Sequence, residues 1–348
     1  MIYHVTCSTD DNYLQHCMAM LCSLFENNKN HKFHVHLLVH SLSQNGRNLI
    51  SNLGQRYQNK TIIYDIDNAS VENLKMNTLA RFNGKQMYSI ATYYRIFLPS
   101  LLPSNIDRIL YLDCDVIVLS DVAELYELNL NNYAVAAVKD STPVNSYHRF
   151  KMGLDLQHNA FCAGVMMINL DFWRETNAQD ALIEYSSRNW KHVYMQDQDA
   201  LNYVFRDHWF MLPYKWGKTL MAVAPVDTCQ RWFDIREYVF RPCIIHYSSH
   251  EKPWLDIWLP DRKYYWEYLH LSNYPNPVVT PLYKKLKIKI YIKIGRYFIA
   301  RYIRPIVPDF IELLLRDILN TIKFIINLFR PKQMKEYLLK RWCQKYRM

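Results

Sequence analysis

Short apolar runs alternate with longer amphipathic stretches through the first half of the chain, up to about residue 170. The runs are only a few residues long and bounded by polar residues, which is typical of strands. We expect strands at Tyr3–Ser8, His34–Leu38, Thr61–Tyr64, Arg108–Leu112, Ala134–Val138 and Gly164–Ile168. Between the first two, Leu14–Phe25 has apolar residues at helical spacing. Strands interleaved with helices predict a Rossmann-like α/β fold with a mostly parallel sheet and ligand binding beyond the strands' carboxyl ends.

The second half of the chain is less regular. A helix is expected at Asp180–Ser187, a second one after the polar stretch Gln196–Asp199, and an apolar run at Cys243–Ile245. Aromatic residues crowd between 254 and 274, and prolines at 275, 277 and 281 mark a linker. We therefore divide the chain into a main domain over residues 1–275 and a C-terminal extension over residues 276–348.

The net positive charge of the chain comes from that extension. Of the 42 Lys and Arg and the 32 Asp and Glu, 17 basic and 4 acidic residues lie in residues 281–348. Apolar residues recur at helical spacing over 311–329, which predicts an amphipathic helix. Such a helix could pack on the protein body or lie on an anionic membrane, where each Lys or Arg contributes about 1 kcal/mol. The near-neutral body argues against a nucleic-acid partner.

The cysteines and the chain start point to the cytoplasm. None of the eight cysteines has CxxC spacing, and several, such as Cys7, Cys17 and Cys243, lie in apolar runs, as buried reduced thiols do. The N-terminal residues lack a basic stretch followed by an apolar core, so we expect no secretory signal. No apolar run reaches the roughly 18 residues of a membrane span. We expect a cytoplasmic protein, peripheral on the inner face of the cell membrane.

The strongest candidate site follows the apolar strand at 108–112. Asp113 and Asp115 are separated by one residue, so in an extended chain both carboxylates point to one side and Cys114 points away. Two convergent carboxylates need a counter-charge, which a hard divalent cation supplies. The alternative is a surface turn with two solvated acids.

Three further polar groups stand where strands and helices are expected to meet. The segment Asp10–Tyr13 either caps the first helix or lines a nucleotide pocket, with Tyr13 stacking on a base. His246 follows an apolar run, where a histidine is more often structural than a ligand, and Lys252 nearby suits a phosphate. The run Gln196–Asp199 has more polar groups than capping explains.

Read together, these motifs resemble a known family. In chain order they are Asp10–Tyr13, Thr92–Arg95, Leu110–Asp115, Phe161–Gly164 with Ile168–Leu170, Gln196–Asn202, and His246–Tyr247 with Lys252–Trp254. The pattern is similar to that of family 8 glycosyltransferases, retaining enzymes with a GT-A fold, and especially to bacterial galactosyl- and glucosyltransferases of lipopolysaccharide or lipooligosaccharide synthesis. It spans roughly residues 3–256.

The resemblance implies a role for each matching position. The metal ligands would be Asp113, Asp115 and His246, holding Mn²⁺ or, alternatively, Mg²⁺. Asp197 and Gln198 would lie beside the reacting carbon of the sugar. The other nucleotide-sugar contacts would come from Asp10, Asp11, Asn12, Tyr13, Arg95, Asp113, Cys114, Asp140, Ser249 and Lys252. The donor would be a UDP-hexose, and the acceptor a lipid-linked oligosaccharide at the inner membrane face, which the basic extension would bind.

The resemblance leaves several points open. The family usually has Asn at the position of Cys162, and a thiol cannot replace the amide, so the hexose could be galactose or glucose. Ser248 and Ser249 also stand where the family often has a small residue. Retention could follow from double displacement by Asp197 or Gln198, or from front-face attack, which we favour because an amide oxygen is a weak nucleophile.

Two other classes compete with this interpretation. A phosphatase of the haloacid dehalogenase type would use Asp113 as nucleophile and Asp115 beside it, although that motif normally lies close to the N-terminus. A non-catalytic membrane-surface protein would be directed by the basic extension alone.

Overall fold

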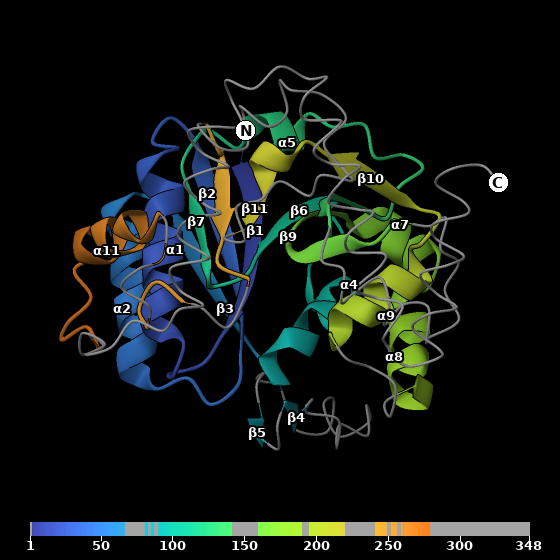
Figure 1. The fold of residues 1–348 in the computed structure, drawn as a ribbon, viewed down its shortest axis with the longest axis horizontal. Coiled ribbons are helices and arrows are strands. Elements are labelled where there is room, and N and C mark those ends of the chain that lie inside the picture. The colour runs from blue at the N-terminus through green and yellow to red at the C-terminus, as the bar shows by residue number, and fades with distance from the viewer. Residues whose placement is uncertain are drawn as a thin grey trace, which may run out of the picture.

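The computed structural model describes residues 2–66, 81–82, 85–86, 90–140, 159–189, 195–219, 241–248, 252–255, 259 and 261–278. A seven-stranded sheet with strand order β10-β8-β9-β6-β1-β2-β3 runs through its centre (Figure 1). Its strands are β1 Ile2–Thr9, β2 Lys32–Val39, β3 Lys60–Asp65, β6 Arg108–Leu112, β8 Val135–Lys139, β9 Phe161–Asn169 and β10 Trp209–Leu212.

The helices cover both faces of this sheet. The sheet has a hydrophobic core on each face, and alternate residues of β6 point into one or the other. Leu110 and Leu112 pack in the core with α1, and Ile109 and Tyr111 pack in the core with α7, α8 and α9. In Figure 1, α1, α2 and α11 lie on one side of the sheet and α7, α8 and α9 on the other. The helices are α1 Leu14–Glu26, α2 Gln44–Arg56, α4 Leu98–Leu101, α5 Ala123–Tyr126, α7 Leu170–Glu175, α8 Ala178–Asn189, α9 Asp197–Val204 and α11 Arg262–Leu271, with 3-10 turns at Ile90–Phe97 and Tyr214–Trp216.

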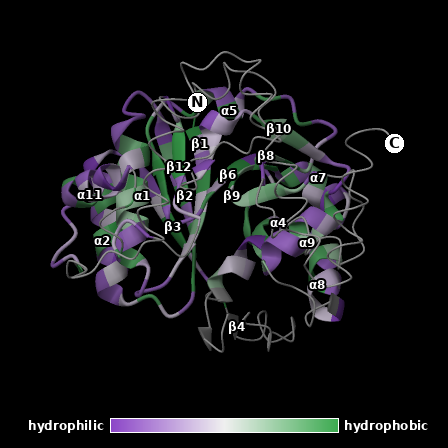
Figure 2. Ribbon diagram, in the orientation of Figure 1, coloured by the Kyte–Doolittle hydropathy of each residue, from purple (hydrophilic) through white to green (hydrophobic). Residues whose placement is uncertain are grey.

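Side-chain caps and apolar strands explain where these elements form. Ser43 Oγ accepts the N–H of Gly46 and begins α2, and the Asn169 side chain accepts the N–H of Phe172 and begins α7. Figure 2 shows the hydrophobic colour concentrated in the central strands, with more hydrophilic colour on the helices around them. The sheet is therefore the buried layer of the molecule.

A second, three-stranded sheet packs on the same side of the central sheet as α1 and positions part of the site. It has the order β11-β12-β7, and β12 runs antiparallel to β7 with Ile245 opposite Ile117. Its strands are β7 Val116–Val118, β11 Lys218–Thr219 and β12 Ile244–His246, and a separate pair is formed by β4 Arg81–Phe82 and β5 Lys85–Gln86.

The structure confirms the predicted strands and the α/β class. The sheet is mostly parallel, but β9 runs antiparallel to both β6 and β8. An apolar run does not encode strand direction, so the sequence pattern could not reveal this reversal. The helices predicted from 14, from 180 and after 196 are present as α1, α8 and α9.

The C-terminal extension lies almost entirely outside the described residues, so the domain division and the amphipathic helix stay predictions. The last described residue, Val278, donates its N–H to Gln15 Oε1 on α1 at 2.7 Å. None of the helices within the described ranges has both the length and the apolar character needed to cross a bilayer.

Candidate active site

Strand pairing places the carboxylate pair and a histidine together at the carboxyl end of β6. Asp113 donates its N–H to the carbonyl of Gly164 at 2.8 Å, and the chain then turns into β7. Because β12 pairs with β7, His246 lies opposite Val116. His246 Nε2 is 3.3 Å from Asp115 Oδ1 and 3.7 Å from Asp113 Oδ2. The three side chains proposed as metal ligands are therefore neighbours.

These three side chains fit a divalent ion. Their donor atoms lie within 4.8 Å of one another. Asp115 Oδ1 is buried and accepts no hydrogen bond from any residue that the structure describes. An unsatisfied buried carboxylate oxygen is costly, and a cation would satisfy it. Two carboxylates and one imidazole suit Mn²⁺, and Mg²⁺ also accepts such oxygen ligands.

Positive charge surrounds one of the carboxylates. Lys252 Nζ donates to Asp115 Oδ2 at 2.5 Å and to the carbonyl of Tyr247 at 2.6 Å. Burial raises the pKa of Asp115, but the charges of Lys252 and His246 outweigh it and hold that pKa well below its usual range. Burial lowers the pKa of His246, whereas Cys162 and Asp115 raise it to a net value above the usual one. Asp115 is thus kept ionised.

A glycine makes room for the histidine. A Cβ on Gly164 would lie 2.1 Å from His246 Cε1, so any other residue would displace the imidazole. On the other side of the ring, Cys162 Sγ is 3.4 Å from Nδ1. With a metal ion on Nε2, the remaining proton would be on Nδ1, which could donate it to this sulfur. Cys162 therefore lies against one of the proposed metal ligands.

Arg95 joins the metal cluster to the predicted catalytic segment. Its Nη2 is 3.1 Å from Asp113 Oδ1, and its Nε is 2.9 Å from Asp197 Oδ2. Nη1 donates to the carbonyl of Ala163 at 2.6 Å, and the guanidinium lies 4.0 Å from the ring centroid of Tyr111. The residue is only 2% exposed. Arg95 is therefore ion-paired with the buried Asp197 and with the partly exposed Asp113 at once.

Asp197 and Gln198, which were predicted to lie beside the reacting carbon of the sugar, are the first two residues of α9. Gln198 Oε1 accepts the N–H of Ala163 at 3.0 Å, and Nε2 donates to Asp140 Oδ2 at 2.9 Å. Burial raises the pKa of Asp197 to about 7, although Arg95 acts in the opposite direction. The structure brings Asp140, Asp197 and Gln198 together, with both ends of the Gln198 amide engaged.

One residue of this region was missed by sequence reasoning as a site residue. Gln196 has a φ of 54°, which is uncommon for a residue other than glycine. Thr92 Oγ1 donates to Gln196 Oε1 at 2.7 Å. The Nε2 atom of Gln196 is buried with no hydrogen-bond partner among the described residues. Strained backbone of this kind clusters at functional sites, and the only signal in the sequence was the polar run itself.

The N-terminal segment forms a turn beside α1. Asp10 accepts the N–H of Tyr13 at 3.0 Å, and Asp11 accepts the N–H and hydroxyl of Ser43 at 3.1 Å and 2.8 Å. Among the described residues, no side chain caps α1 itself; Asp10 instead closes the turn that leads into that helix. The Asn12 side chain is exposed.

An aromatic group continues from this turn towards the metal cluster. The rings of His16 and Trp254 stack with centroids 3.5 Å apart, and Tyr13 meets both edge-on. Burial and the charge of Asp115 raise the pKa of Tyr13. Tyr13 is 39% exposed, which leaves its ring accessible to a nucleotide base.

Two remaining candidates have different outcomes. Cys114 is buried, and its Sγ donates to the carbonyl of Ser8 at 3.2 Å, so it points away from the carboxylates as expected. Any contact with a nucleotide would come from its backbone. Ser249 lies outside the described residues.

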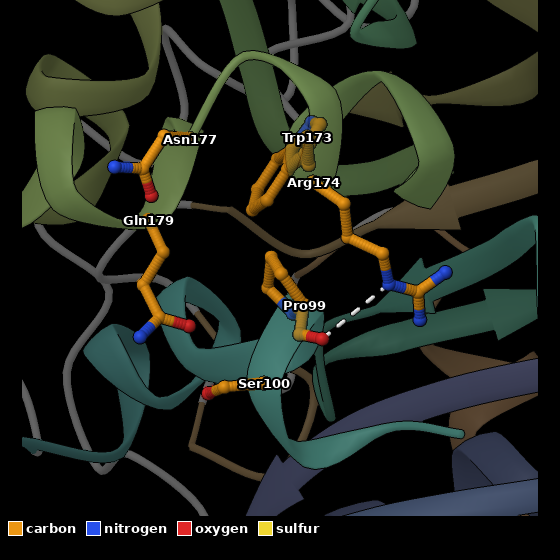
Figure 3. Close-up of a pocket in the computed structure, with 6 residues that line it drawn as sticks. All are labelled: Pro99, Ser100, Trp173, Arg174, Asn177 and Gln179. Atoms are coloured by element: carbon orange, nitrogen blue, oxygen red, sulfur yellow. Dashed lines mark hydrogen bonds between the residues drawn. The ribbon is translucent and has the colours of Figure 1, made fainter. Parts of the chain in front are cut away.

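A separate cavity of about 230 Å³ lies between α4, α7 and α8 (Figure 3). Arg174 donates to the carbonyls of Pro99 and Ile106 at its rim, so its charge serves the fold. None of the predicted site residues lines this cavity, whose walls are Pro99, Ser100, Trp173, Arg174, Asn177 and Gln179.

Comparison with known sequences places the chain in a family. The sequence model of glycosyl transferase family 8 matches residues 4–258. General stress protein A of Bacillus subtilis is 27% identical over 283 residues, which cover 78% of this chain and 94% of that protein. A lipopolysaccharide 1,2-glucosyltransferase of Escherichia coli is 26% identical over 257 residues, covering 73% of this chain and 74% of that protein.

Solved structures agree on the fold. The galactosyltransferase LgtC, crystallised with donor and acceptor sugar analogs, superposes with a TM-score of 0.67 at 20% identity, covering 83% of this chain and 99% of that chain. At this identity the likeness shows the fold, which is the expected GT-A fold. With the family match over most of its length, the chain belongs to glycosyl transferase family 8.

Proposed function

We propose that this chain transfers a hexose, galactose or glucose, from a UDP-sugar to a saccharide acceptor of lipopolysaccharide, lipooligosaccharide or a related surface glycan. Transfer would retain the configuration of the anomeric carbon and use a divalent ion. The observation that carries the proposal is the cluster of Asp113, Asp115 and His246, with one buried carboxylate oxygen lacking a hydrogen bond in the described structure. Membership of a glycosyltransferase family removes the phosphatase interpretation.

The metal ligands and Lys252 would bind the diphosphate of the donor. Asp113, Asp115 and His246 would hold Mn²⁺, or Mg²⁺, which acts as a Lewis acid on the leaving phosphate. Lys252, now 2.5 Å from Asp115, would share its charge with the diphosphate oxygens. Tyr13, with Asp10, Asp11 and Asn12 beside it, would contact the uridine.

The residues around Gln198 would hold the sugar. Asp140 and Gln198 already form one hydrogen-bonded unit at 2.9 Å, and Asp197 is paired with Arg95. The Gln198 amide oxygen already accepts a backbone N–H, which draws electron density from an oxygen that is a weak nucleophile to begin with. This favours front-face attack by the acceptor hydroxyl, with the phosphate or a nearby carboxylate taking the proton.

We further propose that the protein works in the cytoplasm at the inner membrane face. Its acceptor would be lipid-linked, and residues 276–348 would bind anionic lipid through their basic side chains. A chain lacking residues 281–348 should lose its flotation with anionic liposomes and keep its activity on soluble donor. Unchanged flotation would refute membrane binding by the extension without touching the enzymatic proposal.

A donor screen tests the enzymatic proposal. Purified protein with Mn²⁺ is incubated with a panel of UDP-sugars, and UDP release is measured without and with a saccharide acceptor. We expect release from UDP-galactose or UDP-glucose that stops when the ion is chelated. Release from no UDP-sugar, or metal-dependent hydrolysis of simple phosphoesters alone, would overturn the proposal.

A further inference from the structure

Three thiols gather directly behind the carboxylate pair. Cys7 lies on β1, Cys17 on α1, and Cys114 in the turn between Asp113 and Asp115. Their sulfur atoms lie within 4.8 Å of one another, and Cys7 Sγ is 3.8 Å from Cys17 Sγ. The three residues are 0%, 0% and 6% exposed. The cluster takes no part in the proposed reaction.

The spacing of these sulfurs is compatible with a thiolate metal site. With Zn–S bonds of about 2.3 Å, two sulfurs on one tetrahedral ion lie about 3.8 Å apart. That is the separation of Cys7 and Cys17, and it also suits a hydrogen bond between two thiols. Hydrogen bonds also link Cys114 to the other two thiols, so the metal-free cluster is a hydrogen-bonded set of three thiols. For an ion, the third sulfur adds a third soft ligand in the same small space.

We propose that Cys7, Cys17 and Cys114 form a binding site for a soft divalent ion of the zinc and cadmium class. On binding, three S–H bonds break, three metal–sulfur bonds form and three protons pass to solvent, with no change of oxidation state. All three ligands are sulfur, which hard ions such as Mn²⁺ and Mg²⁺ disfavour. The Asp113–Cys114–Asp115 turn would thus separate a hard-ion site from a soft-ion site.

The shared turn makes the two sites interact. Cys114 Sγ donates to the carbonyl of Ser8 at 3.2 Å, and a metal–thiolate bond would replace this contact and draw the turn towards α1. Asp113 and Asp115 would move with it, away from His246. A soft ion should therefore inhibit the transferase. This consequence rests on the proposed function, but binding of the ion does not.

Cadmium binding to the full chain tests the site. The protein is kept reduced with a phosphine, saturated with Mg²⁺ to occupy hard-ion ligands, and titrated with Cd²⁺ over hours, because ions reach buried thiols through local opening. The readouts are the ultraviolet sulfur-to-cadmium charge-transfer band and native mass spectrometry. We expect one Cd²⁺ per chain with such a band.

Matched single-thiol variants locate the ion. Cys17→Ser removes one ligand and should weaken Cd²⁺ binding by at least about tenfold. Cys22→Ser removes a fully buried thiol from the same helix that is outside the cluster, and should bind as the wild type does. If Cys17→Ser fails to fold by circular dichroism, Cys17→Ala and Cys7→Ala replace it.

The outcomes separate this proposal from the proposed function. A wild-type chain without the charge-transfer band, or a band unchanged in the Cys17 variants, would overturn the soft-ion site. Asp115→Asn should retain the Cd²⁺ band while losing transferase activity, so failure of either proposal is visible without the other. Activity unaffected by bound Cd²⁺ would overturn only the inhibitory coupling.

Discussion

Asp115 and Asp197 belong to one site and have side chains only 13% and 5% exposed, yet their pKa values are displaced in opposite directions. Asp115 has two cationic neighbours, Lys252 at 2.5 Å and His246 at 3.3 Å, and its pKa is lowered. Asp197 shares the guanidinium of Arg95 with Asp113, and burial raises its pKa to about 7. Burial acts in the same direction on the pKa of both carboxyls, so the opposite displacements follow from the difference in counter-charge.

We name the two halves of the site after their proposed roles, a metal half and a sugar half. The metal half, with Asp113, Asp115 and His246, keeps Asp115 ionised and leaves one of its oxygens without a hydrogen bond among the described residues, which suits a cation. In the sugar half, the Gln198 amide is hydrogen-bonded to the Ala163 N–H and to Asp140, and Asp197 is ion-paired with Arg95. The residues of this half are suited to orienting a neutral sugar rather than to attacking it.

Substituting one of the proposed metal ligands should have the largest effect on activity. Asp115→Ala deletes a ligand and leaves Lys252 and His246 with uncompensated charge. We expect UDP release from the preferred donor to fall by about 10³-fold, the scale of a lost metal contribution. The control is Asp171→Ala, whose side chain is 53% exposed and outside the site. Near wild-type turnover in Asp115→Ala would show that the cluster is not catalytic.

Breaking the link between the halves should chiefly affect stability. Arg95→Lys cannot contact Asp113, Asp197 and the Ala163 carbonyl together, and it leaves a buried carboxylate unpaired. We expect the free energy of unfolding to drop by about 3 kcal/mol in denaturant titrations. Arg188→Lys, in an ion pair whose arginine is 77% exposed, should change it by no more than about 0.5 kcal/mol. Equal effects would deny that Arg95 bridges the halves.

Loosening the sugar half should slow the reaction with little loss of donor binding. Gln198→Ala removes the hydrogen bonds to the Ala163 N–H and to Asp140. We expect kcat to fall by about 10- to 100-fold, because a misplaced sugar reacts slowly. Steady-state kinetics with Gln55→Ala, an exposed glutamine of α2, provide the baseline. A change confined to KM would argue that Gln198 only binds the donor.

The pH dependence of stability tests the protonation of Asp197. Its folded pKa of about 7 lies above the ordinary value of 3.8. The folded state therefore holds a proton that the unfolded state has lost, and stability falls as pH rises through that window, by at most about 1.4 kcal/mol per pH unit. Asp197→Asn should flatten this slope in denaturant titrations between about pH 4 and pH 8. An unchanged slope would place the proton elsewhere.

The elements predicted well are those encoded locally. The strand at 108–112 and the two acids after it are visible in a few consecutive residues, and α1 follows from apolar spacing over its own length. His246 required the resemblance to the family, because nothing in its local sequence distinguishes a ligand from a structural histidine. The local sequence therefore revealed two of the three proposed metal ligands.

The remaining features depend on residues far apart in the chain. The fit of Gly164 against His246, the burial of Arg95 between two aspartates and the unusual backbone of Gln196 all arise from tertiary contacts. The direction of β9 is likewise set by its neighbours in the sheet. Such features have no periodicity of their own, so pattern analysis could not have predicted them.

The central claim is that Asp113, Asp115 and His246 hold a divalent ion on the diphosphate of the donor. A crystal grown with Mn²⁺ and UDP, measured at the manganese absorption edge, tests it most directly. The account predicts one anomalous peak bonded to these three side chains and to the diphosphate. A crystal in which UDP is bound but manganese is absent from this cluster would contradict it.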